Sequence, residues 1–525
     1  MTFDGTWPDV DYASRDPLDF PPLEHLRRLP ALPPRDRVAG LEAWRRLAPT
    51  SDNWWYNEIG APELVGDVLL GVADLLDDER RRAWGDWLRD AAGPVEPTGQ
   101  NLVWAAGVQL RRGLLVRDGA AVRHEVERMC SVLEPTTGEG VQPDLSFHQH
   151  GPQLYSGGYG ASLVASLARW AHLFTGPATR AFADYLLDGQ QWFAHGDTYD
   201  FTSTGRELVR PDAHGVGPLR AAALALAREG HRADELAACA ARLTGNPGDG
   251  PGGPDDPGAP DNPGDPRDPG DPRGGPLVGT RWFPRSDYLT HRRPGWSATV
   301  RMSSTRTVPT ETLNGENTRG RHLGDGVTAF RATGRPDGYR GAVHRWDWAR
   351  LPGTTTEQGR SLLPRPYLER GASDDVHGWS DGAHGVATMR LDGTDRFTDG
   401  WKTWFCFPDA VVALGAGITG PPGRVLTSVD QRLVAGPVSA RAGEVSHDGL
   451  TYRALAGGWA VEHGDLLTIW FDHGEAPRDA TYAYAVSPAG ASPPIEVLSN
   501  APGAQAVRCG GVTLTRRDAE RTPRR

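Results

Sequence analysis

The sequence predicts an α+β protein of more than one domain, in which a helical first part precedes an antiparallel β second part. Two observations indicate this fold class. Apolar residues recur at three- and four-residue intervals in the first part and at two-residue intervals in the second. A segment dominated by Pro and Gly separates the two patterns. We therefore expect a helical domain over residues 1–244, a linker over 245–276 and a β domain over 277–525.

Length and composition narrow the classes of protein that fit. With 525 residues the chain exceeds what one hydrophobic core usually holds. The net charge of −11 argues against a nucleic-acid partner. No apolar run approaches the ~20 residues of a membrane helix, so we expect no membrane association. The start MTFDGTWPDVDYASRD lacks the basic head and apolar centre of a signal peptide.

The basic residues and the cysteines each bear on the kinds of site that the protein can form. Lys402 is the single lysine among 56 basic residues, so almost every cation is an arginine suited to bidentate contact with carboxylates. The four cysteines lack CxxC or CxH spacing, and they indicate neither a zinc site nor a disulfide scaffold. They are Cys130, Cys239, Cys406 and Cys509.

The first part has the pattern of antiparallel helix pairs. An amphipathic stripe runs from Leu64 to Leu76, a second runs from Leu163 to Phe174, and an alanine-rich stretch runs from Leu219 to Leu243. Gly and Pro interrupt the gaps between them. The linker, GNPGDGPGGPDDPGAPDNPGDPRDPGDPRGGP, cannot form a core because Pro removes backbone donors and Gly adds chain entropy.

The second part has the pattern of many short strands. Alternating apolar and polar residues fill segments that turn signals separate, which favours antiparallel sheets stacked face to face. These segments are WSATVRMSS, HGVATMRL, KTWFCF, AVVALGAGI, LLTIWF and ATYAYAVS.

The segment SFHQHGPQLYSGGYG holds the first candidates for chemistry. His150 and Tyr159 stand on either side of a glycine-rich turn, and Tyr159 falls near the start of a helix. The positive end of that helix and a neighbouring cation would favour the phenolate of Tyr159. Alternatively, Tyr159 packs in a turn and His150 is a hydrogen-bonded surface residue. A metal on His148 and His150 lacks a third ligand at recognisable spacing.

Three further segments concentrate polar groups. In EPTGQNLVW, Asn101 precedes a helix, where its amide can cap the helix or face a ligand. In FTSTGRELVR, Arg206 and Arg210 lie four residues apart, hence on one face if the segment is helical. TLNGENTRG contains a third group, formed by Asn314, Glu316 and Asn317. Each segment alone also fits an ordinary cap, surface pair or turn.

The segment NWWYNEIG places two bulky aromatic residues beside polar ones. An exposed indole offers a flat, rigid surface to the apolar face of a sugar ring. Trp54 and Trp55, with Asn53 beside them, therefore fit a patch that seats a sugar chain. The alternative is that one tryptophan belongs to the core and the other shields it.

Together these segments resemble polysaccharide lyase family 8, which contains hyaluronate, chondroitin AC and xanthan lyases. NWWYNEIG, TGQN, SFHQH with YSGGYG, GRELVR, NGEN and RLPGTTTE follow the order found in that family, and WKTWF, VVALGAGI, DHG and TYAYAVSP continue the match. The resemblance runs from Asn53 to about Pro488. The helical part is shorter than in typical members, and no export signal is visible.

The resemblance implies an incomplete α/α toroid followed by an antiparallel β-sandwich domain. It also implies a lyase on a uronate polymer, an acidic polysaccharide partner, an extracellular location, no cofactor and no metal. We expect a monomer. The implied catalytic residues are Asn101, His150, Tyr159, Arg206, Arg210 and Glu316, and the implied substrate-binding residues are Asn53, Trp54, Trp55, Asn314 and Asn317.

The residue types suit the chemistry of β-elimination. The proton on C5 of a uronate is α to a carboxylate, whose charge must be neutralised before a second charge develops. Asn101 and His150 can donate to that carboxylate, and Tyr159 can act first as base and then as acid. Arg206 and Arg210 would keep Tyr159 ionised. Glu316 would orient His150.

Three other functions compete with a hyaluronan or chondroitin lyase. A xanthan lyase is the alternative within the family. A glycoside hydrolase would need two carboxylates about the scissile bond, and Asp144 with Glu58 or Glu316 are nominal candidates. A carbohydrate-binding protein without activity is the third, although the presence of Asn101, His150 and Tyr159 argues against it.

Overall fold

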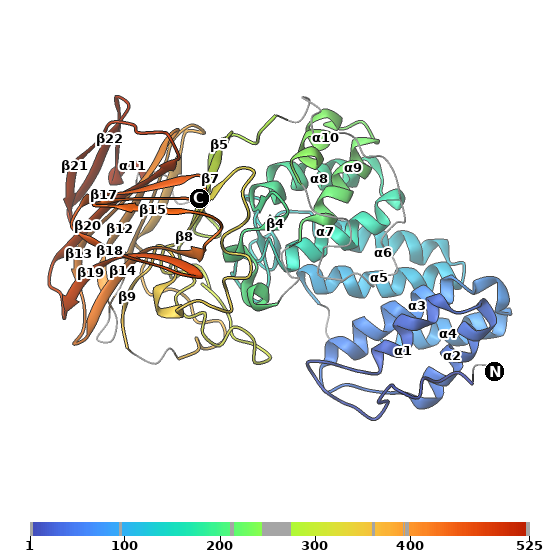
Figure 1. Cartoon of the computed structure of the whole chain (residues 1–525). Coiled ribbons are helices and arrows are strands. Elements are labelled where there is room, and N and C mark those ends of the chain that lie inside the picture. The colour runs from blue at the N-terminus through green and yellow to red at the C-terminus, as the bar shows by residue number, and fades with distance from the viewer. Residues whose placement is uncertain are drawn as a thin grey trace.

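The computed structural model of the chain has a helical domain and a β domain side by side (Figure 1). It describes residues 4–93, 97–210, 215–243, 275–359, 363–391, 393 and 398–520. The expected linker over 245–276 lies outside the described residues apart from its last two positions. The predicted fold class, helices followed by antiparallel sheets, is confirmed.

The helical domain is built from helices that pack as neighbouring pairs, such as α5 with α6 and α9 with α10. Short turns join the partners of a pair, and Asp118 caps α6 by accepting hydrogen bonds from the N–H groups of Ala120 and Ala121. The helices of this domain are α1 (Leu23–Arg28), α2 (Pro34–Leu47), α3 (Ala61–Leu70), α4 (Asp78–Asp90), α5 (Gly99–Leu115), α6 (Gly119–Ser131), α7 (Tyr159–Trp170), α8 (Gly176–Asp188), α9 (Gly217–Ala227) and α10 (Ala233–Arg242).

One helix is shorter than its apolar stripe predicted. The stripe continues to Leu76, but α3 ends at Leu70 and Gly71 follows it. A 3₁₀ turn then covers Ala73–Leu75. Val72 and Leu76, on either side of this turn, still pack in the core with α3, whereas Leu75 within it is 49% exposed, so the stripe predicted too long a helix and only part of the burial.

The β domain contains sheets whose strands all pair antiparallel. The largest has the order β10-β11-β12-β13-β20-β17-β16-β15, and β18-β19-β14-β9, β5-β6-β7-β8 and β21-β22-β23 form the others. Its strands are β5 (Gly279–Phe283), β6 (Tyr288–Arg293), β7 (Trp296–Arg301), β8 (Val327–Ala332), β9 (Thr355–Glu357), β10 (Val376–Ser380), β11 (Gly385–Leu391), β12 (Asp399–Phe407), β13 (Ala410–Thr419), β14 (Arg424–Leu433), β15 (Val438–Arg441), β16 (Glu444–His447), β17 (Leu450–Ala456), β18 (Trp459–His463), β19 (Leu466–Glu475), β20 (Ala480–Pro488), β21 (Ile495–Ala501), β22 (Ala504–Cys509) and β23 (Val512–Thr515), and α11 (Arg516–Glu520) follows.

All six segments that alternation marked as strands are strands, because their apolar residues face sheet interfaces. Two short ribbons lie in the helical domain instead: β1 (Gly140–Val141) with β2 (Phe147–His148), and β3 (Ala194–His195) with β4 (Thr198–Tyr199). The first of these ribbons leads into the turn that carries His150.

A continuous core joins the two domains. Phe193 of the helical domain stacks against Tyr288, with ring centroids 5.1 Å apart, and contacts Phe283. Beside them the buried carboxylate of Asp200 accepts hydrogen bonds from Thr299 and Arg331 of the β domain. Because buried apolar and charged groups both cross the joint, groups from the two domains can be held in fixed register.

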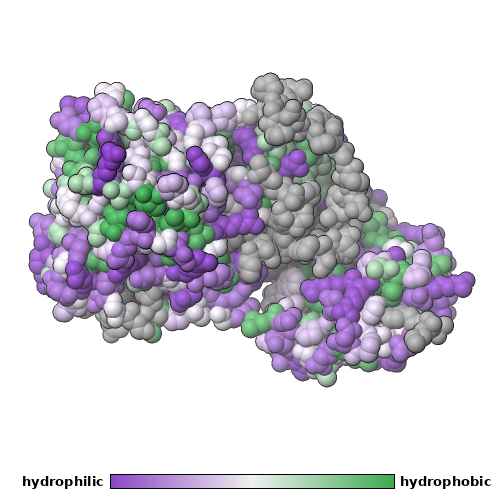
Figure 2. All heavy atoms as spheres, in the orientation of Figure 1, coloured by the Kyte–Doolittle hydropathy of each residue, from purple (hydrophilic) through white to green (hydrophobic). Residues whose placement is uncertain are grey.

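The described exterior is mostly polar on the face that Figure 2 shows, with hydrophobic residues gathered in small patches over the β domain. None of the described helices combines the length and apolarity needed to cross a membrane. All four cysteines carry free thiols; Cys130 is half-buried and the other three are buried.

Candidate active site

His150 lies on the turn between β2 and α7 and is held by a carboxylate from the β domain. Its backbone is left-handed, with φ of 55°. Its Nδ1 lies 2.9 Å from both carboxylate oxygens of Glu311. An anionic partner on Nδ1 fixes the orientation of the ring and leaves Nε2 for a ligand.

Tyr159 is the first residue of α7, as the glycine-rich turn predicted. Its ring centroid lies 5.0 Å from that of His150 and 4.9 Å from that of Tyr155. Its hydroxyl lies 3.4 Å from Nη2 of Arg206. His150, Tyr159 and Arg206 therefore meet at one place, although they come from three separate segments.

The expectation that its surroundings favour the phenolate of Tyr159 is wrong for the unliganded protein. Burial raises the pKa of Tyr159 to about 12, although the Arg206 guanidinium acts in the opposite direction. The carboxylates of Glu207 and Glu311 raise the pKa further. Only 8% of Tyr159 is exposed, so loss of hydration outweighs one cation.

Arg206 and Arg210 reach the same carboxylate across the domain boundary. Glu316 accepts from Nε of Arg206 at 2.8 Å and from Nε of Arg210 at 2.6 Å. Arg206 also pairs with Glu311, and Arg210 pairs with Glu207 at 3.2 Å. The segment forms a 3₁₀ helix, η7 (Gly205–Val209), rather than an α-helix, yet both guanidinium groups still converge.

The prediction that Glu316 orients His150 is wrong, because Glu311 occupies that place. Glu311 lies five residues earlier in the same loop, and it also accepts a hydrogen bond from the hydroxyl of Tyr155 at 2.9 Å. Glu316 instead neutralises the two arginines. Burial alone would raise the pKa of Glu311, but the hydrogen bond and charge of His150 and the charge of Arg206 lower it below its ordinary value.

The two asparagines of the NGEN segment have different surroundings. Asn314 is exposed on a left-handed turn, with φ of 54°. Asn317 is buried, and its amide donates to the backbone oxygen of Glu311 at 2.9 Å and to Thr310. Substrate binding by Asn317 is therefore not supported: its amide shapes the loop that presents Glu311.

Asn101 lies inside the first turn of α5, two residues after the helix begins, rather than before the helix as expected. Its Oδ1 is buried and finds no hydrogen-bond partner among the described residues. It lines a cavity of about 730 Å³ together with Trp54. One turn further along α5, Trp104 contacts Tyr159 with ring centroids 5.8 Å apart. Asn101 therefore opens beside the Tyr159 group.

The structure separates the roles of the adjacent tryptophans. Trp54 is 48% exposed and lines the cavity. Trp55 is half-buried and packs edge-on against Trp104, with centroids 5.6 Å apart. Asn53 is used locally, since its Oδ1 accepts from the N–H of Trp55 and its Nδ2 donates to Pro17. Direct substrate binding by Asn53 is therefore not supported.

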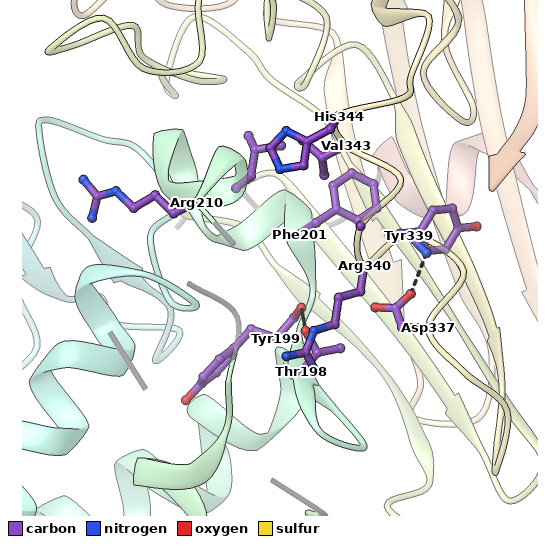
Figure 3. A pocket seen from close by; sticks show the side chains of 11 residues that line it. Thr198, Tyr199, Phe201, Arg210, Asp337, Tyr339, Arg340, Val343 and His344 are labelled. Carbon is purple, nitrogen blue, oxygen red and sulfur yellow. Dashed lines mark hydrogen bonds between the residues drawn. The ribbon is translucent and has the colours of Figure 1, made fainter. Parts of the chain in front are cut away.

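A second cavity, of about 260 Å³, lies at the domain joint. Figure 3 shows Thr198, Tyr199 and Phe201 from the helical domain facing Arg340 and His344 from the β domain. His150 and Tyr159 line neither this cavity nor the one that Asn101 and Trp54 line, but only the latter is linked to Tyr159 through Trp104.

Of the residues that the competing functions require, Asp144 and His148 are used elsewhere, whereas Glu58 lines the cavity with Asn101 and Trp54. The carboxylate of Asp144 accepts from Ser146 and from the N–H of Arg285, which fixes the domain joint. His148 is buried against Ser286, and burial lowers its pKa to about 3. Within the described ranges no cluster of three or more His, Cys, Asp or Glu residues could hold a metal ion.

Sequence reasoning missed several residues of this group. Tyr155 lies in the examined segment SFHQHGPQLYSGGYG, and Glu311 lies one residue before TLNGENTRG, but nothing local separates either from structural residues. Tyr367 was also missed: it is 52% exposed, and its ring lies 6.4 Å from that of His150. An exposed aromatic residue beside a candidate imidazole is visible only after the chain has folded.

Comparison with known proteins places this geometry in a family. Residues 35–211 match the model of the polysaccharide lyase family 8, N terminal alpha-helical domain, and residues 278–464 match the polysaccharide lyase family 8, super-sandwich domain. A chondroitinase-AC of Pedobacter heparinus is 27% identical over 94% of this chain and 76% of that protein.

Other relatives cover the chain almost as fully. A hyaluronate lyase of Thermasporomyces composti is 27% identical over 83% of the chain, and a xanthan lyase of Bacillus sp. (strain GL1) is 26% identical over 87%. The chain spans 64% and 57% of those two proteins.

The likeness extends to three dimensions. A solved chondroitinase AC lyase is 26% identical and superposes with a TM-score of 0.84 over 96% of this chain and 83% of that one. Both domains, in the same order, are thereby matched in sequence and in fold, and the chain belongs to polysaccharide lyase family 8.

Proposed function

We propose that the protein cleaves a uronate-containing glycosaminoglycan, hyaluronan or chondroitin, by β-elimination. The convergence of His150, Tyr159 and Arg206, which Trp104 links to the helix of Asn101, carries the proposal. Relatives named chondroitinase, hyaluronate lyase and xanthan lyase support an acidic polysaccharide as the substrate class. A xanthan lyase is the alternative within the family. The extracellular location and the monomeric state remain predictions.

The amide of Asn101 and the imidazole of His150 meet the substrate carboxylate in this proposal. The side-chain oxygen of Asn101 finds no partner among the described residues, and the amide nitrogen beside it carries the N–H donors that a uronate entering the cavity can use. With Nδ1–H donated to Glu311, Nε2 of His150 is a second donor only in the imidazolium form, in which both ring nitrogens carry protons. These donors stabilise the second negative charge that develops on the carboxylate when C5 loses its proton.

Tyr159 moves the proton. Because its pKa is about 12, its resting form is the phenol. It must first release its proton to water, and the nearby guanidinium of Arg206 lowers the cost of that step. The phenolate then takes the C5 proton, the C4–C5 double bond forms, and the C4–O bond breaks. The departing oxygen takes the proton back from Tyr159.

Two exposed aromatic residues flank this group and would seat the polymer. Trp54 comes from the helical domain, and Tyr367 comes from a loop of the β domain. Rigid aromatic faces bind the apolar faces of sugar rings with little loss of entropy. The cavity beside Trp54 is large enough to take more than one sugar ring.

A substrate panel tests the proposal. Hyaluronan, chondroitin sulfate and xanthan are each incubated with the protein while the ultraviolet absorbance of an unsaturated uronate is followed. We expect absorbance to rise with hyaluronan or chondroitin sulfate. New reducing ends without that absorbance would indicate a hydrolase, and a rise with xanthan alone would indicate the alternative within the family. Binding without any product would indicate an inactive binding protein.

A further inference from the structure

Glu139 joins the two segments that carry the proposed carboxylate donors. It lies directly before β1, and its side chain is half-buried. Its Oε2 accepts from the hydroxyl of Thr98 at 2.6 Å and from Nε2 of Gln149 at 2.5 Å. Its Oε1 accepts from the N–H of Gly151 at 2.8 Å. Thr98 immediately precedes the helix of Asn101, whereas Gln149 and Gly151 lie on either side of His150 in sequence.

Gln149 closes the connection from the other side. It is fully buried, and its Oε1 accepts from the N–H of Gln100 at 2.9 Å. Gly99 lies against this side chain with φ of 55°, and a Cβ there would come within 2.3 Å of Gln149 Oε1. Glycine is therefore required at position 99 for close approach and for backbone conformation. These hydrogen bonds join the start of α5 to the His150 turn. Neither Asn101 nor His150 takes part in them.

We propose that Glu139 is a positioning residue that sets the separation between the amide of Asn101 and the imidazole of His150. This inference rests on the proposed function, in which both groups must meet one uronate carboxylate. The His150 turn needs such support because His150 and Gly151 both have positive φ, of 55° and 77°. The bond from Gly151 N–H to Glu139 holds the turn in that conformation, close to the start of α5.

The carboxylate is chemically necessary because three donors converge on its two oxygens. Glu139→Gln keeps the size of the side chain but replaces one accepting oxygen with a donating amide nitrogen. At least one of the three hydrogen bonds is then lost and replaced by opposed donors. We expect kcat to fall about 10- to 100-fold, as for residues that orient catalytic ligands elsewhere. KM should stay the same or fall, because a negative charge beside an anionic substrate has been removed.

A double-mutant cycle separates positioning from general damage. Glu139→Gln, Asn101→Ala and the double variant are compared by kcat and KM on the polymer that the wild-type protein cleaves. If Glu139 acts by aligning Asn101 with His150, Glu139→Gln should cost less than threefold in kcat once Asn101 is already absent. Glu134→Gln, at an exposed site earlier in the same loop, is the matched control and should leave kcat unchanged.

Each result decides the inference. An unchanged kcat in Glu139→Gln, or an equal loss with and without Asn101, would overturn it. Should Glu139→Gln fail to fold by circular dichroism, Thr98→Val removes one of the three donors, and a two- to fivefold loss of kcat with unchanged KM is expected; no loss there would overturn the inference. Absence of unsaturated product from the wild-type protein on every polymer would instead remove the proposed function, which is a distinguishable outcome.

Discussion

Replacing Glu311 with Gln tests which carboxylate serves His150. Glu311 is 1% exposed and receives hydrogen bonds from His150, Tyr155 and Arg206. The Gln side chain fits the same space, but it carries no charge and turns one acceptor into a donor. His150 then loses the anion that holds its ring, whereas Arg206 keeps Glu316 as a partner.

The magnitude follows from the bond that is lost. A hydrogen bond to a charged group contributes about 1.5–3 kcal/mol, and each 1.36 kcal/mol in a barrier is a factor of ten in rate. If the transition state loses the full value, kcat falls about 10- to 150-fold. The free energy of unfolding should fall by about 1–3 kcal/mol, because a buried donor on Tyr155 or Arg206 is left poorly matched.

Initial rates of absorbance increase at saturating polymer give kcat, and thermal unfolding gives the stability. Glu316→Gln is the comparison: it leaves the His150–Glu311 contact in place, so its loss in kcat should be several times smaller. A larger loss of kcat in Glu316→Gln than in Glu311→Gln would refute the assignment of Glu311 to His150, since both substitutions remove one charge from the same loop.

Three further outcomes are expected. Tyr159→Phe should lower kcat at least 10³-fold while KM changes little, because the base and acid are lost together; a residual rate above a tenth of wild type would remove Tyr159 from the mechanism. Trp54→Ala should raise KM about tenfold, with Leu75→Ala as an exposed control, and an unchanged KM would exclude stacking. Folding favours the phenol of Tyr159, whose pKa is about 12 against ~10 when unfolded. Its contribution of about 2–3 kcal/mol to the free energy of unfolding is therefore complete below pH 10 and lost towards pH 12. When unfolding is followed against alkaline pH, Tyr159→Phe should lose less stability than the wild-type protein, and equal losses would contradict the shift.

The fold could be predicted largely from periodicity, because burial imposes the same spacing on any sequence that forms these elements. The alternation in AVVALGAGI and ATYAYAVS predicted strands, and β13 and β20 pair with each other. The ends of helices were harder to predict than the strands. The stripe through Leu76 gave no sign that α3 stops at Leu70, because Val72 and Leu76 stay buried beyond the end of the helix.

The candidate site could be predicted only where one segment carries the information. Tyr159 falls at the start of α7 because the glycines before it favour a turn rather than a helix, and this position could be predicted from the segment itself. The partner of His150 was not, since Glu311 lies 161 residues away and Glu316 in the same loop is an equally acidic choice. The pKa of Tyr159 was misjudged because burial, which outweighs the charge of Arg206, leaves no trace in local sequence.

Two carboxylates beside the proposed base look unfavourable in a protein whose substrate is a polyanion, yet they follow from the chemistry. Glu311 and Glu316 both pair with Arg206, so this guanidinium is too well neutralised to bind the polymer strongly in its ground state. Tight ground-state binding would lower KM without lowering the barrier to proton removal. The charge of Arg206 instead acts over 3.4 Å on Tyr159, where a phenolate must form. The substrate carboxylate is left to Asn101 and His150, whose hydrogen bonds strengthen as its charge grows. Arg206 comes from the helical domain, whereas Glu311 and Glu316 come from the β domain. This arrangement of charges therefore exists only while the buried joint between the domains is intact.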